Sequence, residues 1–193
     1  MLNQAGFNAK GLELSPSIVQ FARDTFGVDV LTGPIEDQSI PDESLDAIVM
    51  MDVMEHLPDP MQTLGRCVDL LKPNGILLVQ TPGYPETTSL AELKSTGHKF
   101  PMMLDPGEHL FLFSRHSAAE IFRRLNAPNI RFLSAIFGFY DMSFVVSKQP
   151  AVEISIADRD AALSSNVSRR IIQALLDLDD RRLELLDKYR QLK

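Results

Sequence analysis

Two carboxylates and a histidine follow directly after an almost unbroken apolar run. Residues 45–51 read Leu-Asp-Ala-Ile-Val-Met-Met, and Asp52, Glu55 and His56 come next. Such a run is typical of a strand that is covered on both faces in a parallel α/β sheet. Ligands of open α/β sheets bind outside the carboxyl ends of the strands, so this stretch predicts a central strand and one edge of a ligand site. The alternative is a buried strand and an ordinary loop, with Asp52 as a helix cap.

Two more groups of candidate residues follow earlier predicted strands. Glu13 ends a short strand, and a carboxylate there can accept hydrogen bonds from two ribose hydroxyls. The alternative is an acid that favours the start of the next helix. Residues 33–36, Gly-Pro-Ile-Glu, form a loop in which Ile35 could pack on an adenine ring, or which is an ordinary surface loop.

Histidines offer acid–base chemistry near neutral pH, and His56 and His109 are the candidates for a general base. We expect no metal site. Glu55 and His56 are adjacent and would point in different directions on a helix, and no third or fourth ligand is evident from the spacing. His98 and His116 are expected at the surface.

The order of predicted elements determines the fold class. A continuous alternation of strands and helices predicts a mainly parallel sheet with right-handed crossovers. The last two strands follow each other closely around a turn at 138–141, which predicts an antiparallel hairpin. Residues 82–113 form a long proline-rich segment of the kind that serves as a lid or binding loop. The predicted strands are 9–14, 28–31, 45–51, 76–81, 130–137 and 142–148, and the predicted helices are 16–26, 60–71 and 114–126.

Composition excludes several classes of protein. The chain has 193 residues, a net charge of −7 and one cysteine, Cys67. The acidic balance argues against a nucleic-acid partner, and a single cysteine excludes an intrachain disulfide framework. Neither an apolar run long enough to span a membrane nor a signal peptide is evident. We therefore expect a cytoplasmic protein without a membrane partner.

The composition changes after Pro150. Apolar residues from Ile171 to Leu192 follow alternating spacings of four and three, with Arg182 as one polar break. This heptad-like pattern is compatible with a coiled coil, and it predicts a homodimer through the helix at 165–193. The alternative is an amphipathic helix that packs on its own domain.

Four ordered segments together resemble the class I S-adenosylmethionine-dependent methyltransferases, and within them the ubiquinone-biosynthesis-like, type 11 and type 23 group. The segments are GLELSPSIVQFAR, IPDESLDAIVMMDVMEHLPDP, LLKPNGILLVQTP and EHLFLFSRHSAAEIFRRLN, within residues 5–148. The resemblance implies a Rossmann-like α/β fold, a seven-stranded sheet that ends in an antiparallel hairpin, and S-adenosylmethionine as the methyl donor.

The resemblance also implies roles for individual residues. Glu13, with Leu14 beside it, matches the ribose-binding acid. Pro34, Ile35 and Glu36 match the adenine-side loop, and Met51 and Asp52 match residues beside the methionine portion. We expect Asp52 and His109 as the catalytic residues, and Tyr84 and His56 as contacts of the acceptor.

The sequence departs from the family pattern in two ways. The family's first strand and its glycine-rich loop precede the ribose-binding acid by about 20 residues, but only twelve residues precede Glu13. We therefore expect a methyltransferase domain over 1–149 that lacks a central strand through loss of an N-terminal segment, followed by a helical extension over 150–193. Pro34 stands where the family often has an acidic residue, so adenine recognition is expected to differ.

These features together predict methyl transfer to an O, N or C nucleophile of a small-molecule or glycan-type acceptor. A second hypothesis is a non-catalytic Rossmann-like module that assembles through its C-terminal helix. A third is a nicotinamide-dependent oxidoreductase on a similar sheet, against which the EHLPDP and KPNG segments and the terminal hairpin argue.

Overall fold

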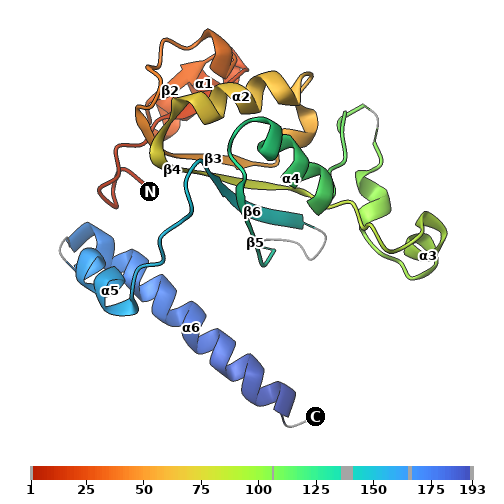
Figure 1. Cartoon of the computed structure of the whole chain (residues 1–193). Coiled ribbons are helices and arrows are strands. Elements are labelled where there is room, and N and C mark those ends of the chain that lie inside the picture. Colours follow the sequence, from red (N-terminus) through yellow and green to blue (C-terminus); the bar gives the residue numbers. More distant parts are fainter. Residues whose placement is uncertain (1, 106, 136–140, 165–166, 192–193) are drawn as a thin grey trace. The chain divides into compact units, whose positions relative to one another are not determined.

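The computed structural model describes residues 2–105, 107–135, 141–164 and 167–191 (Figure 1). The chain divides into two compact units. Residues 1–33 and 152–193 form the first unit, and residues 34–151 form the second. No helix in the described part of the chain is long and apolar enough to cross a membrane.

The first unit contains a short parallel pair of strands with a helix between them. Gly11–Glu13 (β1) pairs with Val30–Thr32 (β2), and Pro16–Phe26 (α1) connects them. Helix α1 begins and ends as the sequence predicts, with Pro16 in its first turn and Gly27 in the left-handed conformation at φ +61°. Its expected apolar face is mostly exposed: among the described residues of this helix, Val19 alone is buried.

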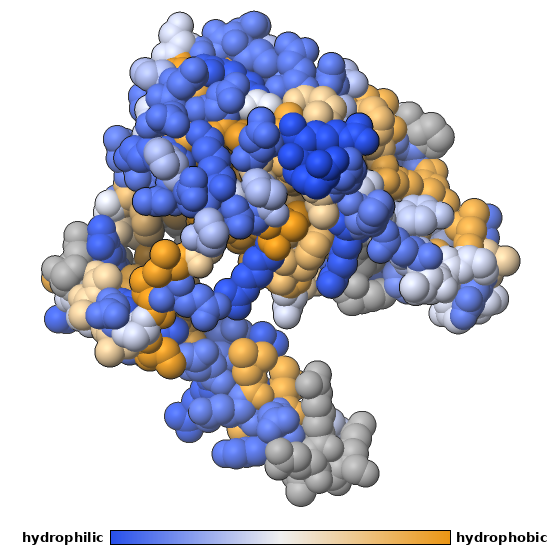
Figure 2. Space-filling view, in the orientation of Figure 1, coloured by the Kyte–Doolittle hydropathy of each residue, from blue (hydrophilic) through white to orange (hydrophobic). Residues whose placement is uncertain are grey.

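The C-terminal part of the first unit is helical, as expected. It consists of Ile156–Ser164 (α5), the 3-10 turn Val167–Arg169 (η4) and Arg170–Gln191 (α6). Leu175, Leu178 and Leu185 on α6 are more than half exposed. Figure 2 shows hydrophobic side chains on the surface of this helix between charged ones. The side chain of Ile171 and all of Leu192, which belong to the predicted heptad pattern, lie outside the described residues.

The second unit is built on a four-stranded sheet. Its strand order is β3-β4-β6-β5, with bounds Leu45–Met51 (β3), Leu71–Pro82 (β4), Asn129–Leu133 (β5) and Asp141–Ser147 (β6). Strands β3 and β4 are parallel, and β6 is antiparallel to both β4 and β5. The predicted antiparallel hairpin is therefore confirmed, although residues 138–140 of the turn predicted at 138–141 lie outside the described residues.

The strands form two sheets in the described residues, where the sequence predicted one mainly parallel sheet. Strand β1 pairs only with β2, and β3 pairs only with β4, so both are edge strands within the described part.

Strand β3 has the predicted bounds but not the predicted burial. Met50 is buried, Ile48 is partly buried, and Ala47 and Val49 are exposed. The alternation shows one covered face and one open face, so the prediction of a strand covered on both faces was wrong. Its apolar run resembled that of a fully buried strand because Ala47 and Val49 are apolar on the open face.

The described part of the second unit contains three helices, of which the first and the last pack against this sheet. They are Pro60–Leu70 (α2), Leu90–Ser95 (α3) and Arg115–Arg124 (α4), with 3-10 turns at Ile35–Asp37 (η1), Met54–His56 (η2) and Phe100–Met103 (η3). Asp59 caps α2 as its carboxylate accepts a hydrogen bond from the amide of Gln62 at 3.0 Å. The core combines Leu64 and Val68 of α2 with Phe122 of α4 and Phe144 of β6.

Two local predictions differ from the structure. Residues 72–75 were expected to end a helix, but they belong to β4, which begins at Leu71 and is accommodated by a register irregularity between Leu45 and Ala47. The long segment at 82–113 was predicted as a lid or binding loop, but it contains α3 and η3, and its Phe100 and Phe113 are buried. Burial of these two phenylalanine side chains is stabilising, and the prediction of a loop did not include it.

Candidate functional site

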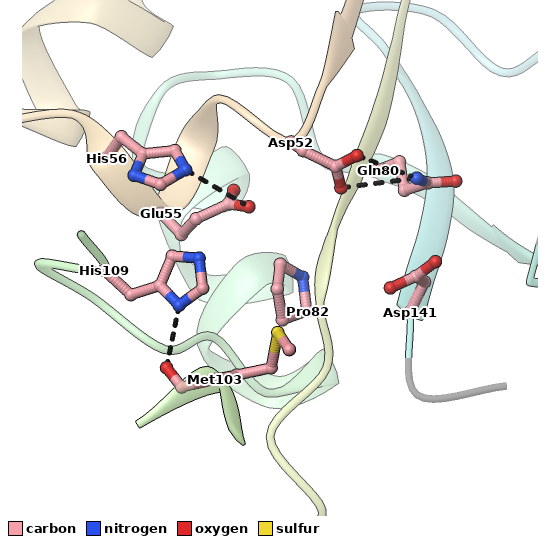
Figure 3. A pocket seen from close by; sticks show the side chains of 8 residues that line it. All are labelled: Asp52, Glu55, His56, Gln80, Pro82, Met103, His109 and Asp141. Atoms are coloured by element: carbon pink, nitrogen blue, oxygen red, sulfur yellow. Dashed lines mark hydrogen bonds and ion pairs between the residues drawn. The ribbon is translucent and has the colours of Figure 1, made fainter. Parts of the chain in front are cut away.

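A pocket of about 290 Å³ opens where β3 and β4 end in the second unit. Its walls come from the residues after β3, from the end of β4, from Met103 and His109, and from the start of β6. The lining residues are Asp52, Glu55, His56, Gln80, Pro82, Met103, His109 and Asp141. Figure 3 shows their side chains. The pocket thus lies at the carboxyl ends of a parallel pair, where the sequence predicted a ligand site.

Asp52 sits at the turn that ends β3. Its φ is +52°, in the left-handed region that aspartate and asparagine adopt more readily than other side chains. Its amide donates to the carbonyl oxygen of Gln80 at 2.9 Å, and the Gln80 amide nitrogen lies 3.3 Å from each carboxylate oxygen. Strand β4 therefore holds both the backbone and the exposed carboxylate of Asp52.

Glu55 is a buried acid, with 1% of its surface exposed. Its Oε2 accepts a hydrogen bond from the Thr81 hydroxyl at 2.9 Å. Its backbone carbonyl accepts from the amides of Leu110 and Phe111 at 2.9 and 3.1 Å. The two backbone bonds fix the segment around residue 109 beside η2. The Thr81 bond occupies Oε2, so Oε1 of Glu55 is the oxygen that can contact another partner.

His56 and His109 are each held by a backbone carbonyl. Nδ1 of His56 lies 2.5 Å from the oxygen of Glu108, and Nδ1 of His109 lies 2.7 Å from the oxygen of Met103. A carbonyl oxygen can only accept, so each Nδ1 carries the proton. In the neutral imidazole, Nε2 then holds a free lone pair. The ring centroids are 4.9 Å apart.

Glu55, His56 and His109 converge on one point. One ligand atom from each of the three side chains lies within 4.8 Å of the other two. Nε2 of His56 is 3.9 Å from Oε1 of Glu55. In Figure 3 the ring nitrogen of His109 that is remote from Met103 points toward this pair. The sequence reading missed His109 as a partner of Glu55 and His56, because it lies more than fifty residues along the chain.

The predicted ribose-binding acid ends β1 in the first unit. Oε1 of Glu13 accepts a hydrogen bond from the amide of Ser15 at 2.8 Å, at the start of α1. The alternative role of this acid, support of a helix N-terminus, is thus realised in the structure. Oε2 is the oxygen that can face a ribose hydroxyl, so the carboxylate still fits that task. Leu14 is 67% exposed.

The predicted adenine-side loop is largely occupied by contacts within the second unit. Pro34 precedes η1, and its carbonyl accepts from the Gln38 side chain at 2.9 Å. Ile35 is partly buried against the core. The Glu36 carboxylate accepts from the Thr63 hydroxyl on α2. The loop follows β2, as the sequence predicts. Much of the Ile35 side chain, however, packs against the core.

The remaining predicted residues lie in different surroundings. Met51 ends β3 opposite Gln80 and is partly exposed. Tyr84 does not line the pocket; it is 49% exposed and makes an edge contact with Phe100. His116 is exposed, as predicted, and His98 is partly buried, with Nδ1 accepting from the amide of Phe100 at 3.0 Å.

Four pocket residues were not predicted: Gln80, Pro82, Met103 and Asp141. Gln80 and Pro82 could have been found, because the rule that selected Asp52 applies equally to the end of the neighbouring parallel strand. Asp141 enters because it pairs with Pro82 across the antiparallel ladder. The sequence does not indicate that Met103 lies at the site, because its position depends on how the long segment at 82–113 folds.

Comparison with known proteins gives a consistent result. Residues 1–131 match the family described as "Methyltransferase domain". A ubiquinone biosynthesis O-methyltransferase of Xanthomonas campestris pv. campestris is 33% identical over 82 residues, 39% of this chain and 34% of the relative. Its counterpart from Actinobacillus pleuropneumoniae is 29% identical over 119 residues, 56% of this chain and 50% of the relative. The matched region thus spans between a third and a half of these curated relatives.

A solved structure supports the fold. A SAM-dependent methyltransferase of Thermotoga maritima superposes with a TM-score of 0.54 at 20% identity, covering 72% of each chain. The family match spans most of this sequence, and the fold of this neighbour agrees with it. The chain therefore belongs to the methyltransferase-domain family.

Proposed function

We propose that this protein transfers a methyl group from S-adenosylmethionine to a small-molecule or glycan-type acceptor that binds in the pocket beyond β3 and β4. The observation that carries the proposal is the convergence of Asp52, Glu55, His56 and His109 at the carboxyl end of a parallel strand pair, in a chain of this family. Such a site combines an acceptor cavity with groups that can orient a nucleophile and take its proton.

S-adenosylmethionine supplies a methyl group on a positively charged sulfur. The residues proposed to hold it are Glu13, Leu14, Pro34, Ile35, Glu36, Met51 and Asp52. The carboxylate of Glu13 has one oxygen held by the Ser15 amide, so its second oxygen is suited to ribose hydroxyls. The carboxylate of Asp52 is exposed at the pocket and favours a nearby positive charge.

His109 is the proposed general base. Its Nδ1 proton is committed to the carbonyl oxygen of Met103, which leaves the lone pair on Nε2 to accept a proton from an acceptor hydroxyl or amine. When the acceptor bonds to the methyl carbon and the carbon–sulfur bond of the donor breaks to leave a neutral thioether, Nε2 of His109 would take up that proton. The buried carboxylate of Glu55 stabilises the imidazolium that results, because opposite charges attract strongly where water is excluded.

Asp52 and His56 are proposed to orient the acceptor. Asp52 is fixed by Gln80, and His56 by the Glu108 carbonyl, so neither side chain has to be ordered when the acceptor binds. Such preorganisation contributes to the rate by keeping the nucleophile aligned. Tyr84 is proposed as an outer acceptor contact from the segment at 82–113.

Replacement of the proposed base gives a direct test of this mechanism. We expect His109→Gln to lower kcat by about 10²- to 10⁴-fold with little change in S-adenosylmethionine affinity, when methyl transfer is followed with a labelled donor and a panel of hydroxylated small molecules. The matched control is His116→Gln, which changes an exposed histidine of α4. Equal activity of the two variants would contradict the role of His109.

A second part of the proposal concerns assembly. We infer that α6 pairs with α6 of a second copy through the exposed leucines of its heptad-like pattern. Leu178, Leu185 and Leu186 line a shallow apolar groove on the helix together with Arg181 and Arg182. An apolar stripe of this kind gains stability when a second helix covers it.

A further inference from the structure

We propose that Glu55, His56 and His109 form a binding site for one divalent transition-metal ion, of which zinc is the best-suited representative. Two imidazole nitrogens and one carboxylate oxygen are the donor set of many catalytic zinc sites, which leave a fourth position open. The proposal depends only on the geometry of these three side chains and holds whether or not the protein transfers methyl groups.

The first argument is the direction of the lone pairs. Both Nδ1 atoms bind backbone carbonyl oxygens, of Glu108 and Met103, so both Nε2 atoms carry lone pairs. Metal-binding histidines are usually held in this way, with the second ring nitrogen donating to a carbonyl or carboxylate, because that bond fixes the tautomer and the ring orientation. Here both outer bonds already exist.

The carboxylate shows the same arrangement. Oε2 of Glu55 accepts the Thr81 hydroxyl, and Oε1 faces His56. Glu55 has 1% of its surface exposed, and a buried carboxylate needs a partner of opposite charge because it has lost its hydration. A divalent ion between Glu55 and the two rings would supply that charge. Asp52 and Asp141, which also line the pocket, add to the attraction for a cation.

The distances require only a small adjustment. Ligand atoms about 2.0–2.1 Å from a tetrahedral zinc ion are about 3.3 Å apart. The three groups lie within 4.8 Å of one another, and the His56–Glu55 pair is at 3.9 Å. Rotations of the rings and of the carboxylate that bring these atoms up to about 1.5 Å closer together would close the site. The open side faces the 290 Å³ pocket, which provides the entry path and the fourth position.

The ion would compete with a proton for the Nε2 lone pair of His109. If His109 acts as the general base, zinc is therefore expected to inhibit methyl transfer. Metal binding and methyl transfer can be measured separately, so a failure of one proposal does not affect the test of the other.

Direct binding tests the site. Tag-free full-length protein, cleared of metal with a chelator and desalted, is titrated with zinc chloride in competition with a chromophoric chelator. We expect one equivalent per chain, and an affinity lower by about 100-fold or more in His109→Gln and in Glu55→Gln. The controls are His98→Gln and His116→Gln, two histidines that do not line the pocket, and both are expected to bind as the wild type does.

A second measurement covers the case in which a variant folds poorly. His109→Cys keeps a ligand at this position, and its cobalt(II) complex is expected to show a thiolate-to-metal charge-transfer band that the wild type lacks. Cys67 is buried and is present in both proteins, so a band found only in the variant comes from the new cysteine. No binding by the folded wild type, unchanged affinity in His109→Gln, or a cobalt complex of His109→Cys without the band would overturn the proposal.

Discussion

The hydroxyl of Thr81 donates a hydrogen bond to Oε2 of Glu55 over 2.9 Å, and both residues are buried. The two side chains come from the end of β4 and from the turn η2, so this bond joins the sheet to the residues of the pocket. Without it, Oε2 of the buried Glu55 carboxylate would lose this hydrogen-bond donor. The bond therefore helps to hold Glu55 toward His56 and His109.

Removal of this hydroxyl should destabilise the fold. Thr81→Val keeps the shape of the side chain but leaves the Glu55 oxygen unsatisfied, and we expect a loss of about 1–3 kcal/mol in the free energy of unfolding. Urea denaturation followed by circular dichroism measures the change. Thr81→Ser, which retains the hydroxyl, should lose less. Equal losses in the two variants would show that packing, and not the hydrogen bond, is responsible.

The backbone of Asp52 makes a separate prediction. Its φ of +52° disfavours β-branched side chains, so Asp52→Val should lower the stability by about 1–3 kcal/mol. Asp52→Asn should fold nearly as well as the wild type, because asparagine tolerates this conformation. The asparagine variant should nevertheless lose methyl-transfer activity, since it lacks the charge. Thermal unfolding and activity assays separate the two effects, and a stable, fully active valine variant would refute both.

Cys67 predicts a dependence of stability on alkaline pH. Burial, followed by the charge of Glu36, raises the pKa of its thiol from 9.0 to about 12. The unfolded thiol ionises first, so its contribution to stability is complete below pH 9 and is lost as the pH rises toward 12. In Cys67→Ala the free energy of unfolding should fall less steeply across this window. Parallel pH profiles of the two proteins above pH 9 would contradict the prediction.

The proposed pairing of α6 predicts a change of mass. Leu178→Glu together with Leu185→Glu places charges on the exposed apolar stripe, and the variant should sediment as a monomer where the wild type sediments as a dimer. Glu184→Gln, an exposed change on the same helix, is the control. Identical masses of the wild type and the double variant in analytical ultracentrifugation would exclude pairing through this stripe.

Local signals predicted the boundaries of several elements well. Pro16 and Gly27 delimit α1, Asp59 and Pro60 begin α2, and the apolar run at 45–51 has the bounds of β3. Each of these signals depends on neighbours within a few residues. The features that were predicted wrongly depend on contacts between residues far apart in the sequence. Strand β4 begins at Leu71 because Leu71 pairs with Leu45, although residues 72–75 resemble the end of a helix.

The candidate site was predicted in part for the same reason. Asp52 and His56 follow a strand and are visible as strand-end residues, whereas the approach of His109 depends on amides of Leu110 and Phe111 that bind the carbonyl of Glu55. Tyr84 was chosen as an aromatic residue in a long connection, but it contacts Phe100 and does not line the pocket. Side-chain direction in such a connection follows from tertiary packing.

The central claim is that the protein uses S-adenosylmethionine as its methyl donor. Saturation binding of S-adenosylmethionine to the full-length protein, measured by equilibrium dialysis, tests this claim most directly. We predict saturable binding of one molecule per chain, with an affinity reduced about tenfold or more in Glu13→Gln, because one hydrogen bond to a charged group contributes about 1.5–3 kcal/mol. Glu184→Gln should bind as the wild type does. A folded wild-type protein that does not bind S-adenosylmethionine would contradict the account.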